Sequence, residues 1–172
     1  FASREEKLRH QAHFGVLQEY ARSGKLNELI LLSNKSLLEQ IGAGPIRKYY
    51  EKVNHYIYST FQNINYCENV DQDFGKIHEP KEISRISTIG YNSLEGEEVL
   101  LFPLDNITES CYYINVDEED LDNDEGILPT CQQIVRENNG LERHSSFAIW
   151  KSSEAENNYY VKHYTHYIQE SK

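Results

Sequence analysis

The chain has 172 residues, of which 17 are Lys or Arg and 28 are Asp or Glu, so its formal net charge at pH 7 is −11. This length suits one domain, and the shares of apolar (38%) and charged (26%) residues are typical of a folded chain rather than a disordered one. No apolar run approaches the roughly 20 residues of a membrane-spanning helix, so no membrane span is expected.

Three helices are predicted in the first sixty residues. Apolar side chains recur at i, i+4 spacing over residues 4–22. A second apolar run, residues 26–41, is interrupted at Ser33 and Asn34, whose side chains compete for backbone hydrogen bonds. The third helix starts at Pro45, which suits a first helical turn, and it keeps helical spacing as far as Phe61. We expect this third helix to lie across the core.

After residue 61 the sequence changes to β-branched and aromatic runs separated by polar turns, which predicts strands. The segment 83–91 has isoleucines three residues apart but also Ser and Thr, and we interpret it as a strand. A short polar link at 152–157 predicts a hairpin between the last two strands. The remaining candidate strands are residues 97–104, 111–116, 131–137, 145–151 and 158–168.

Helices followed by strands predict an α+β fold, with N-terminal helices followed by a curved antiparallel sheet packed on one long helix. Parallel βαβ units are not expected, because no helix-length segment is recognised among the later strands. We assign residues 1–44 to an N-terminal helical arm and residues 45–172 to the α+β domain. Truncating Tyr50 or Val53 on the third helix to Ala is then expected to cost about 2–4 kcal/mol.

The charge is unevenly distributed, and this bears on partners. Residues 1–60 carry nine Lys or Arg against six Asp or Glu, whereas residues 61–142 carry four against nineteen. Nucleic-acid binding needs clustered basic residues that release counterions from phosphates. The acidic middle section therefore argues against a nucleic acid as the partner.

The three cysteines leave two interpretations open. Cys67, Cys111 and Cys131 have no C-x-x-C spacing, so a structural zinc site is not expected. Cys111 and Cys131 each begin a strand-like run, and a disulfide would join them if those runs were neighbours. The alternative is that all three are buried reduced thiols.

The first residues, Phe1-Ala2-Ser3, and the lack of methionine indicate a processed or excised piece. Small residues of this kind follow signal-peptide cleavage sites, and a cloning boundary gives the same pattern. We expect a secreted or periplasmic protein, with a cytoplasmic location as the alternative.

No catalytic residue, cofactor or metal ion is predicted. The alternating carboxylates Asp120, Asp122 and Asp124 precede a glycine, as in calcium loops, but the EF-hand pattern fails at its glycine and its last carboxylate. A solvated acidic loop is the alternative. The chain has no G-x-S-x-G, and the glycines at 42 and 44 lack the lysine of a P-loop. A non-catalytic protein is therefore favoured over an enzyme.

Thirteen tyrosines are the most unusual feature of the composition. Many fall on the third helix and on strands expected to face it, where amphipathic rings suit both interfaces and half-buried sheets. We assign most of them to the core and leave some for a binding face. Trp150 is expected in the core, and the histidine pairs His10/His13 and His163/His166 are expected at the surface.

The order of elements resembles the cystatin-like superfold, which includes cystatins, latexin and nuclear-transport-factor-2-like (NTF2-like) domains. The stretch Ser146-Phe147-Ala148-Ile149-Trp150-Lys151, continued by Tyr159-Tyr160-Val161-Lys162, is similar to the closing hairpin of such domains. The inhibitory Q-x-V-x-G loop of cystatins is absent from residues 131–136, so protease inhibition is not implied.

Two functions follow from the resemblance and the missing motifs. The first is a non-catalytic protein-interaction module, exported or surface-displayed, that binds a protein partner through an acidic or tyrosine-rich face. The second is an NTF2-like pocket domain that binds a small ligand, with isomerase or hydrolase activity. The sequence leaves the oligomeric state open, with a homodimer as one alternative, because pocket domains of the NTF2-like type often pair through their sheets.

Overall fold

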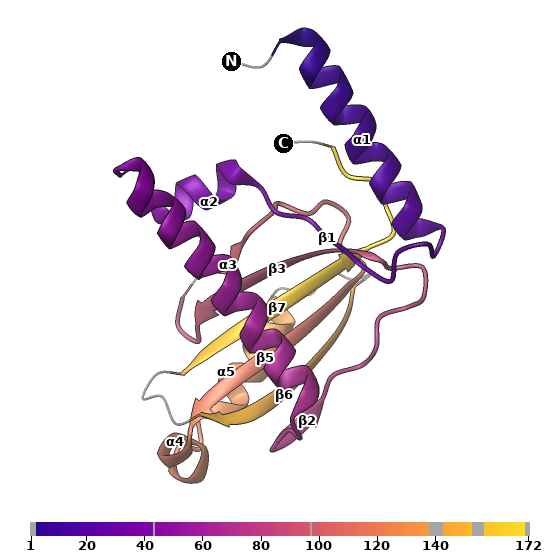
Figure 1. The fold of residues 1–172 in the computed structure, drawn as a ribbon. Coiled ribbons are helices and arrows are strands. Elements are labelled where there is room, and N and C mark those ends of the chain that lie inside the picture. Colours follow the sequence, from indigo (N-terminus) through magenta and orange to yellow (C-terminus); the bar gives the residue numbers. More distant parts are fainter. Residues whose placement is uncertain (1–2, 43, 97, 138–142, 153–156, 171–172) are drawn as a thin grey trace.

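A computed structural model describes residues 3–42, 44–96, 98–137, 143–152 and 157–170 (Figure 1). In chain order the elements are α1 (Arg4–Arg22), β1 (Leu29–Ile30), α2 (Asn34–Ile41), α3 (Ile46–Asn69), β2 (Phe74–Lys76), β3 (Ile86–Ser93), β4 (Val99–Leu100), β5 (Glu109–Asp117), α4 (Glu118–Asn123), α5 (Ile127–Glu137), β6 (His144–Ser152) and β7 (Asn158–Thr165).

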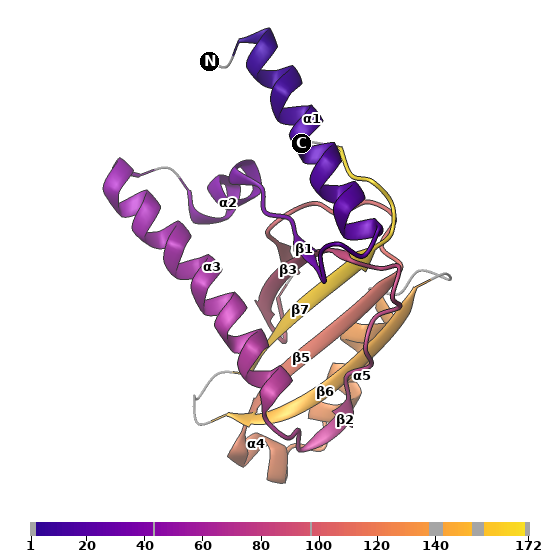
Figure 2. The same cartoon turned by 45° about the vertical axis from the view of Figure 1, so that its right-hand side comes forward.

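These elements form a mixed α/β fold around a seven-stranded sheet (Figures 1 and 2). The strand order is β1-β3-β7-β5-β6-β2, and β4 pairs with β3 outside this path. Helix α3 packs on one face of the sheet and α5 on the other, which gives two apolar clusters, and a third cluster includes Ala21 of α1 and Ile86 of β3. None of the described helices is long and apolar enough to cross a membrane.

The first helix lies as predicted, and the second predicted helix is divided. A capping box starts α1, because the Glu6 amide donates to Ser3 Oγ over 3.2 Å and the Ser3 amide donates to Glu6 Oε2 over 2.6 Å. The run 26–41 contains strand β1 and helix α2, and Ser33 is the N-cap of α2. The division of the chain at residue 44 stays a prediction.

Helix α3 begins after Pro45, as predicted, and continues two turns beyond Phe61. Val53, Ile64 and Cys67 are buried against the sheet. Tyr50 is 60% exposed. The expected core loss for Tyr50→Ala is therefore wrong, whereas Val53, at 8% exposure, is a core residue.

The prediction of a curved antiparallel sheet without βαβ units is wrong, because the sheet is mixed. Strands β5 and β6 run parallel from Glu109 opposite His144 to Asp117 opposite Ser152, and α4 and α5 connect them. The predicted strand 131–137 is the second half of α5. Ile127, Cys131 and Val135 recur every four residues and are all buried, which is the pattern of one helix face.

The predicted hairpin of the last two strands is also wrong. Strand β7 pairs antiparallel with β3 on one side and with β5 on the other, so it lies in the middle of the sheet, separated from β6 by β5. A central strand is covered on both faces, which explains why nearly every residue of β7 is buried. The candidate strand 97–104 contributes only the two residues of β4.

Candidate functional site

Helix α3 has a buried inner face and an exposed outer face (Figures 1 and 2). At 100° per residue, positions i, i+4, i+8, i+11 and i+15 form one stripe along a helix. The exposed residues that follow this spacing on α3 are Tyr50, Asn54, Tyr58, Phe61 and Asn65, called here the α3 stripe. Tyr50, Tyr58 and Phe61 are 60%, 63% and 51% exposed.

Four of the five residues of the α3 stripe, all except Tyr50, lie in a part of the chain without charged residues. No Asp, Glu, Lys or Arg occurs from Asn54 to Cys67, although the whole chain has a net charge of −11. The stripe extends for about 23 Å along the helix. It therefore presents aromatic and amide side chains without like-charge repulsion, as the centre of a protein–protein interface requires.

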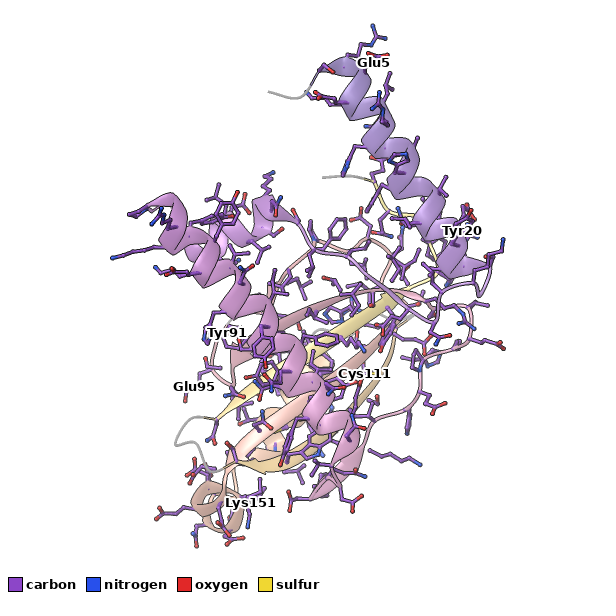
Figure 3. The ribbon with its side chains drawn as sticks, in the orientation of Figure 1. Glu5, Tyr20, Tyr91, Glu95, Cys111 and Lys151 are labelled. Carbon is purple, nitrogen blue, oxygen red and sulfur yellow. The ribbon has the colours of Figure 1, made fainter. Side chains whose placement is uncertain are left out.

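A cavity of about 630 Å³ lies on the inner side, beneath the C-terminal end of α3. Residues 67–72 and 76–80 form its walls, and Cys111, Tyr113, Trp150 and Tyr164 belong to its lining on the sheet. Figure 3 labels Cys111 on the sheet below α3. The Trp150 Nε1–H donates to the Val70 carbonyl over 3.0 Å, which ties the end of α3 to β6.

A buried lysine lies beside this cavity. The Lys162 side chain is 7% exposed, and its Nζ lies 3.1 Å from Glu28 Oε2 and 3.3 Å from Glu68 Oε1. The Tyr113 hydroxyl donates to the same Glu68 oxygen over 2.7 Å. The ammonium thus has two counter-charges, one from the segment before β1 and one from α3, and these contacts join three distant parts of the chain.

This buried ion cluster was not predicted from the sequence, although one of its residues carries a signal. Lys162 stands in the run Tyr159-Tyr160-Val161-Lys162-His163-Tyr164, where strand alternation places it on the same face as Tyr160 and Tyr164. A lysine on the buried face of a strand requires a carboxylate partner. Its partners, Glu28 and Glu68, are distant in sequence, and no local sequence pattern identifies them as the partners of Lys162.

All three cysteines are free thiols, so the disulfide alternative is wrong. Cys111 belongs to the α3 side of the sheet and Cys131 to the α5 side, and the sheet separates them. Burial is the main factor that raises the pKa of Cys67 to about 12 and the pKa values of Cys111 and Cys131 to about 11. None of them is an activated nucleophile, because the thiolate is the reactive form.

We therefore expect the native thiols to resist alkylation. At pH 8, a pKa raised from 9.0 to about 11 lowers the thiolate fraction about 100-fold. Iodoacetamide labelling followed by mass spectrometry should show no adduct on the folded chain over an hour and three adducts in urea. Rapid labelling of the folded chain would show that the thiols are accessible and ionised.

A hydrogen-bonded chain of Ser110, His163 and Glu98 lies on the α5 side of the sheet. Ser110 Oγ is 2.7 Å from His163 Nδ1, and His163 Nε2 is 2.7 Å from Glu98 Oε1. Ser110 is 1% exposed and His163 0% exposed, so no substrate reaches the hydroxyl. The expectation that His163 lies at the surface is therefore wrong, and the chain is a buried polar network rather than a catalytic triad.

The acidic run is not a calcium loop in the part of the chain that is described. Asp120 and Asp122 lie on helix α4, and Asp124 follows as its C-cap. Asp120 Oδ2 accepts a hydrogen bond from Asn157, and Asp124 Oδ1 accepts one from the Gly126 amide. No group of three His, Cys, Asp or Glu among the described residues is placed to hold a metal ion.

The fold is similar to that of FtsZ and CetZ. A dimer of FtsZ from M. jannaschii matches with a TM-score of 0.59 at 11% identity, over 81% of this chain and 45% of the FtsZ chain. A point mutant of FtsZ from M. jannaschii matches with a TM-score of 0.59 at 14% identity, over 83% of this chain and 47% of the FtsZ chain. CetZ from Methanosaeta thermophila matches with a TM-score of 0.53 at 12% identity, over 81% of this chain and 42% of the CetZ chain.

At these identities the likeness defines a fold and nothing more, and the chain spans less than half the length of each neighbour. No family model and no curated sequence matches the chain. The resemblance to cystatin-like and NTF2-like domains is wrong, because these neighbours have a different fold. The NTF2-like pocket domain, inferred from that resemblance, and the exported interaction module, inferred from the missing motifs, the charge and the aromatic residues, are both wrong as well.

Proposed function

We propose that this protein is a self-associating subunit with an FtsZ-like fold, and that two copies pair through their α3 stripes. The observation that carries the proposal is the exposure of Tyr58 and Phe61 on a helical stretch without charged residues, in a strongly acidic chain. Copies of one acidic protein repel each other, so their contact favours the surface with the least charge. One of the FtsZ neighbours is itself a dimer, which supports the proposal that this fold self-associates.

The stripe has a geometry that suits a symmetric contact. It lies on one straight helix of 24 residues, at the outside of the molecule, and its aromatic residues alternate with Asn54 and Asn65. In an antiparallel pair of α3 helices, each stripe meets its own copy, as two-fold symmetry requires. Asparagine side chains then supply both donors and acceptors to the partner copy.

Sedimentation equilibrium tests this proposal. We expect the average mass to rise from monomer to dimer as the concentration increases through the micromolar range. Tyr58→Glu or Phe61→Glu should lower the association constant at least about tenfold, since each places a carboxylate at the centre of the contact. Added salt should strengthen the dimer, because it screens the repulsion between the two acidic copies.

Tyr66→Glu is the matched control. Tyr66 is 57% exposed on the same helix, but its position lies about 120° around the axis from the middle of the stripe. The dimer of this variant should match the wild type. Equal loss of association in Tyr58→Glu and Tyr66→Glu, or a wild type that remains monomeric at high micromolar concentration, would contradict the proposal.

A further inference from the structure

A second surface, on the α5 side of the sheet, has features that the proposed self-association does not use. Two adjoining cavities of about 640 and 600 Å³ share Leu94, Glu95 and Thr130. They lie between residues 91–96 with Glu98, helix α5 and the start of β7, and together they are called here the α5 groove. Figure 3 shows Glu95 near Tyr91, away from α1 and from Lys151.

The α5 groove has charges of one sign. Its lining includes the carboxylates Glu95, Glu98, Asp124 and Glu137, and no Lys or Arg within the described ranges belongs to it. Leu94 and Ile127 add apolar surface between the carboxylates. A groove of this composition attracts cations that also carry a hydrocarbon chain.

Unsatisfied polar groups point to a ligand in the groove. Tyr159 lines it and is 2% exposed, and its hydroxyl makes no hydrogen bond with any residue in the described part of the chain. Asn92 Nδ2 and Glu98 Oε2, which line the same groove, are buried without a partner there. Buried polar groups are nearly always hydrogen-bonded in native proteins, so two unmet buried atoms beside the Tyr159 hydroxyl are unusual.

The electrostatics of Tyr159 agree with this location. Burial raises the pKa of the Tyr159 hydroxyl, and the nearby Glu98 carboxylate raises it further. The hydroxyl therefore keeps its proton and presents both a donor and an acceptor to the groove. The only described ion partner of Glu98 is His163.

The carboxylates are distributed along the groove instead of converging on one point. No three such groups among the residues with described positions are close enough to share a metal ion. Separated carboxylates joined by an apolar wall match a ligand whose positive charges are themselves separated by methylene groups.

We propose that the α5 groove binds a linear aliphatic polyamine, with its ammonium groups on Glu95 and Glu137 and one ammonium near Tyr159. The ammonium groups donate hydrogen bonds to the two rim carboxylates, and one of them donates to the Tyr159 oxygen. The methylene segments lie on Leu94 and Ile127. This site is independent of the α3 stripe, which lies on the opposite side of the sheet.

Isothermal titration calorimetry with spermidine at physiological ionic strength tests the proposal on the intact chain. We expect one binding site in the wild type. The double variant Glu95→Gln/Glu137→Gln should bind at least about tenfold more weakly, because two charge-assisted hydrogen bonds become neutral ones. Tyr159→Phe removes only the hydroxyl and should weaken binding about threefold or more.

The control is Glu19→Gln/Glu82→Gln, which removes the same charge at two exposed positions, 62% and 91% exposed, outside the groove. It should bind spermidine as the wild type does, and urea unfolding confirms that each variant is folded. Equal weakening in the control, or displacement of spermidine by an equal concentration of Mg²⁺, would show only non-specific attraction to an acidic protein. Either outcome would overturn the proposal, as would displacement by an equal concentration of pentalysine, which would indicate a peptide site.

Discussion

Replacing both Glu28 and Glu68 by Gln should lower the free energy of unfolding by about 3–5 kcal/mol. In the native protein the Lys162 ammonium lies 3.1 and 3.3 Å from these two carboxylates, and its side chain is only 7% exposed. The double substitution leaves this buried ammonium without a counter-charge. A buried charge without a partner is among the most destabilising changes in a protein. Urea unfolding at pH 7, followed by circular dichroism, measures the effect.

Lys162→Met is the control for this prediction. It removes the buried cation and leaves two carboxylates, whose side chains are 27% and 38% exposed and so remain accessible to water. The loss should be smaller than in the double Gln variant, because the remaining charges are solvated. A larger loss in Lys162→Met would contradict this account, because Met keeps most of the packing and the loss would then come from the two carboxylates left without their cation.

Leu37→Ala should lower the free energy of unfolding by about 2–5 kcal/mol, whereas Leu38→Ala should change it by less than about 1 kcal/mol. The two residues are neighbours on α2, but Leu37 is 1% exposed and packs in the core beneath α3, whereas Leu38 is 47% exposed. The pair compares identical chemistry at adjacent positions. Equal effects in urea unfolding would show that α2 does not dock on the core as described.

Individual helices and strands were predictable where the sequence has a clear apolar pattern and a residue that starts or ends the element. Pro45 marks the start of α3, and the continuous aromatic and apolar run around Tyr112 and Tyr113 marks β5. Trp150 is in the core, as expected from its place in an apolar strand. In each of these cases the periodicity of the apolar residues and a nearby turn or cap residue indicate the same element.

Helix α5 was misread because of its composition. Ile134 and Val135 are β-branched and favour strands, so the run 131–137 reads as one. The four-residue spacing of Ile127, Cys131 and Val135, with Pro129 in the first turn, indicates a helix instead. Once this segment is a helix between β5 and β6, a parallel connection follows, and the antiparallel sheet is no longer expected.

The order of the strands was not predictable from local sequence. The short link after β6 allows a hairpin, yet β7 pairs with β3 and β5 because its two apolar faces fit the middle of the sheet. The same limit applies to the candidate surfaces. Spacing alone does not show that Tyr58 and Phe61 point to solvent while Val53 and Ile64 point to the sheet, because both sets keep helical periodicity.

The distance between two copies of α3 in solution tests the central claim most directly. A spin label on Gln62→Cys lies beside the α3 stripe, about 80° around the helix axis from its middle, and the buried native thiols leave this site as the accessible one. Double electron–electron resonance should then give an intermolecular distance within about 30 Å, from helix axes about 10 Å apart. A label on Arg136→Cys of α5, on the other side of the sheet, should give about 50 Å. No intermolecular signal from Gln62→Cys, or a shorter distance from Arg136→Cys, would contradict pairing through α3.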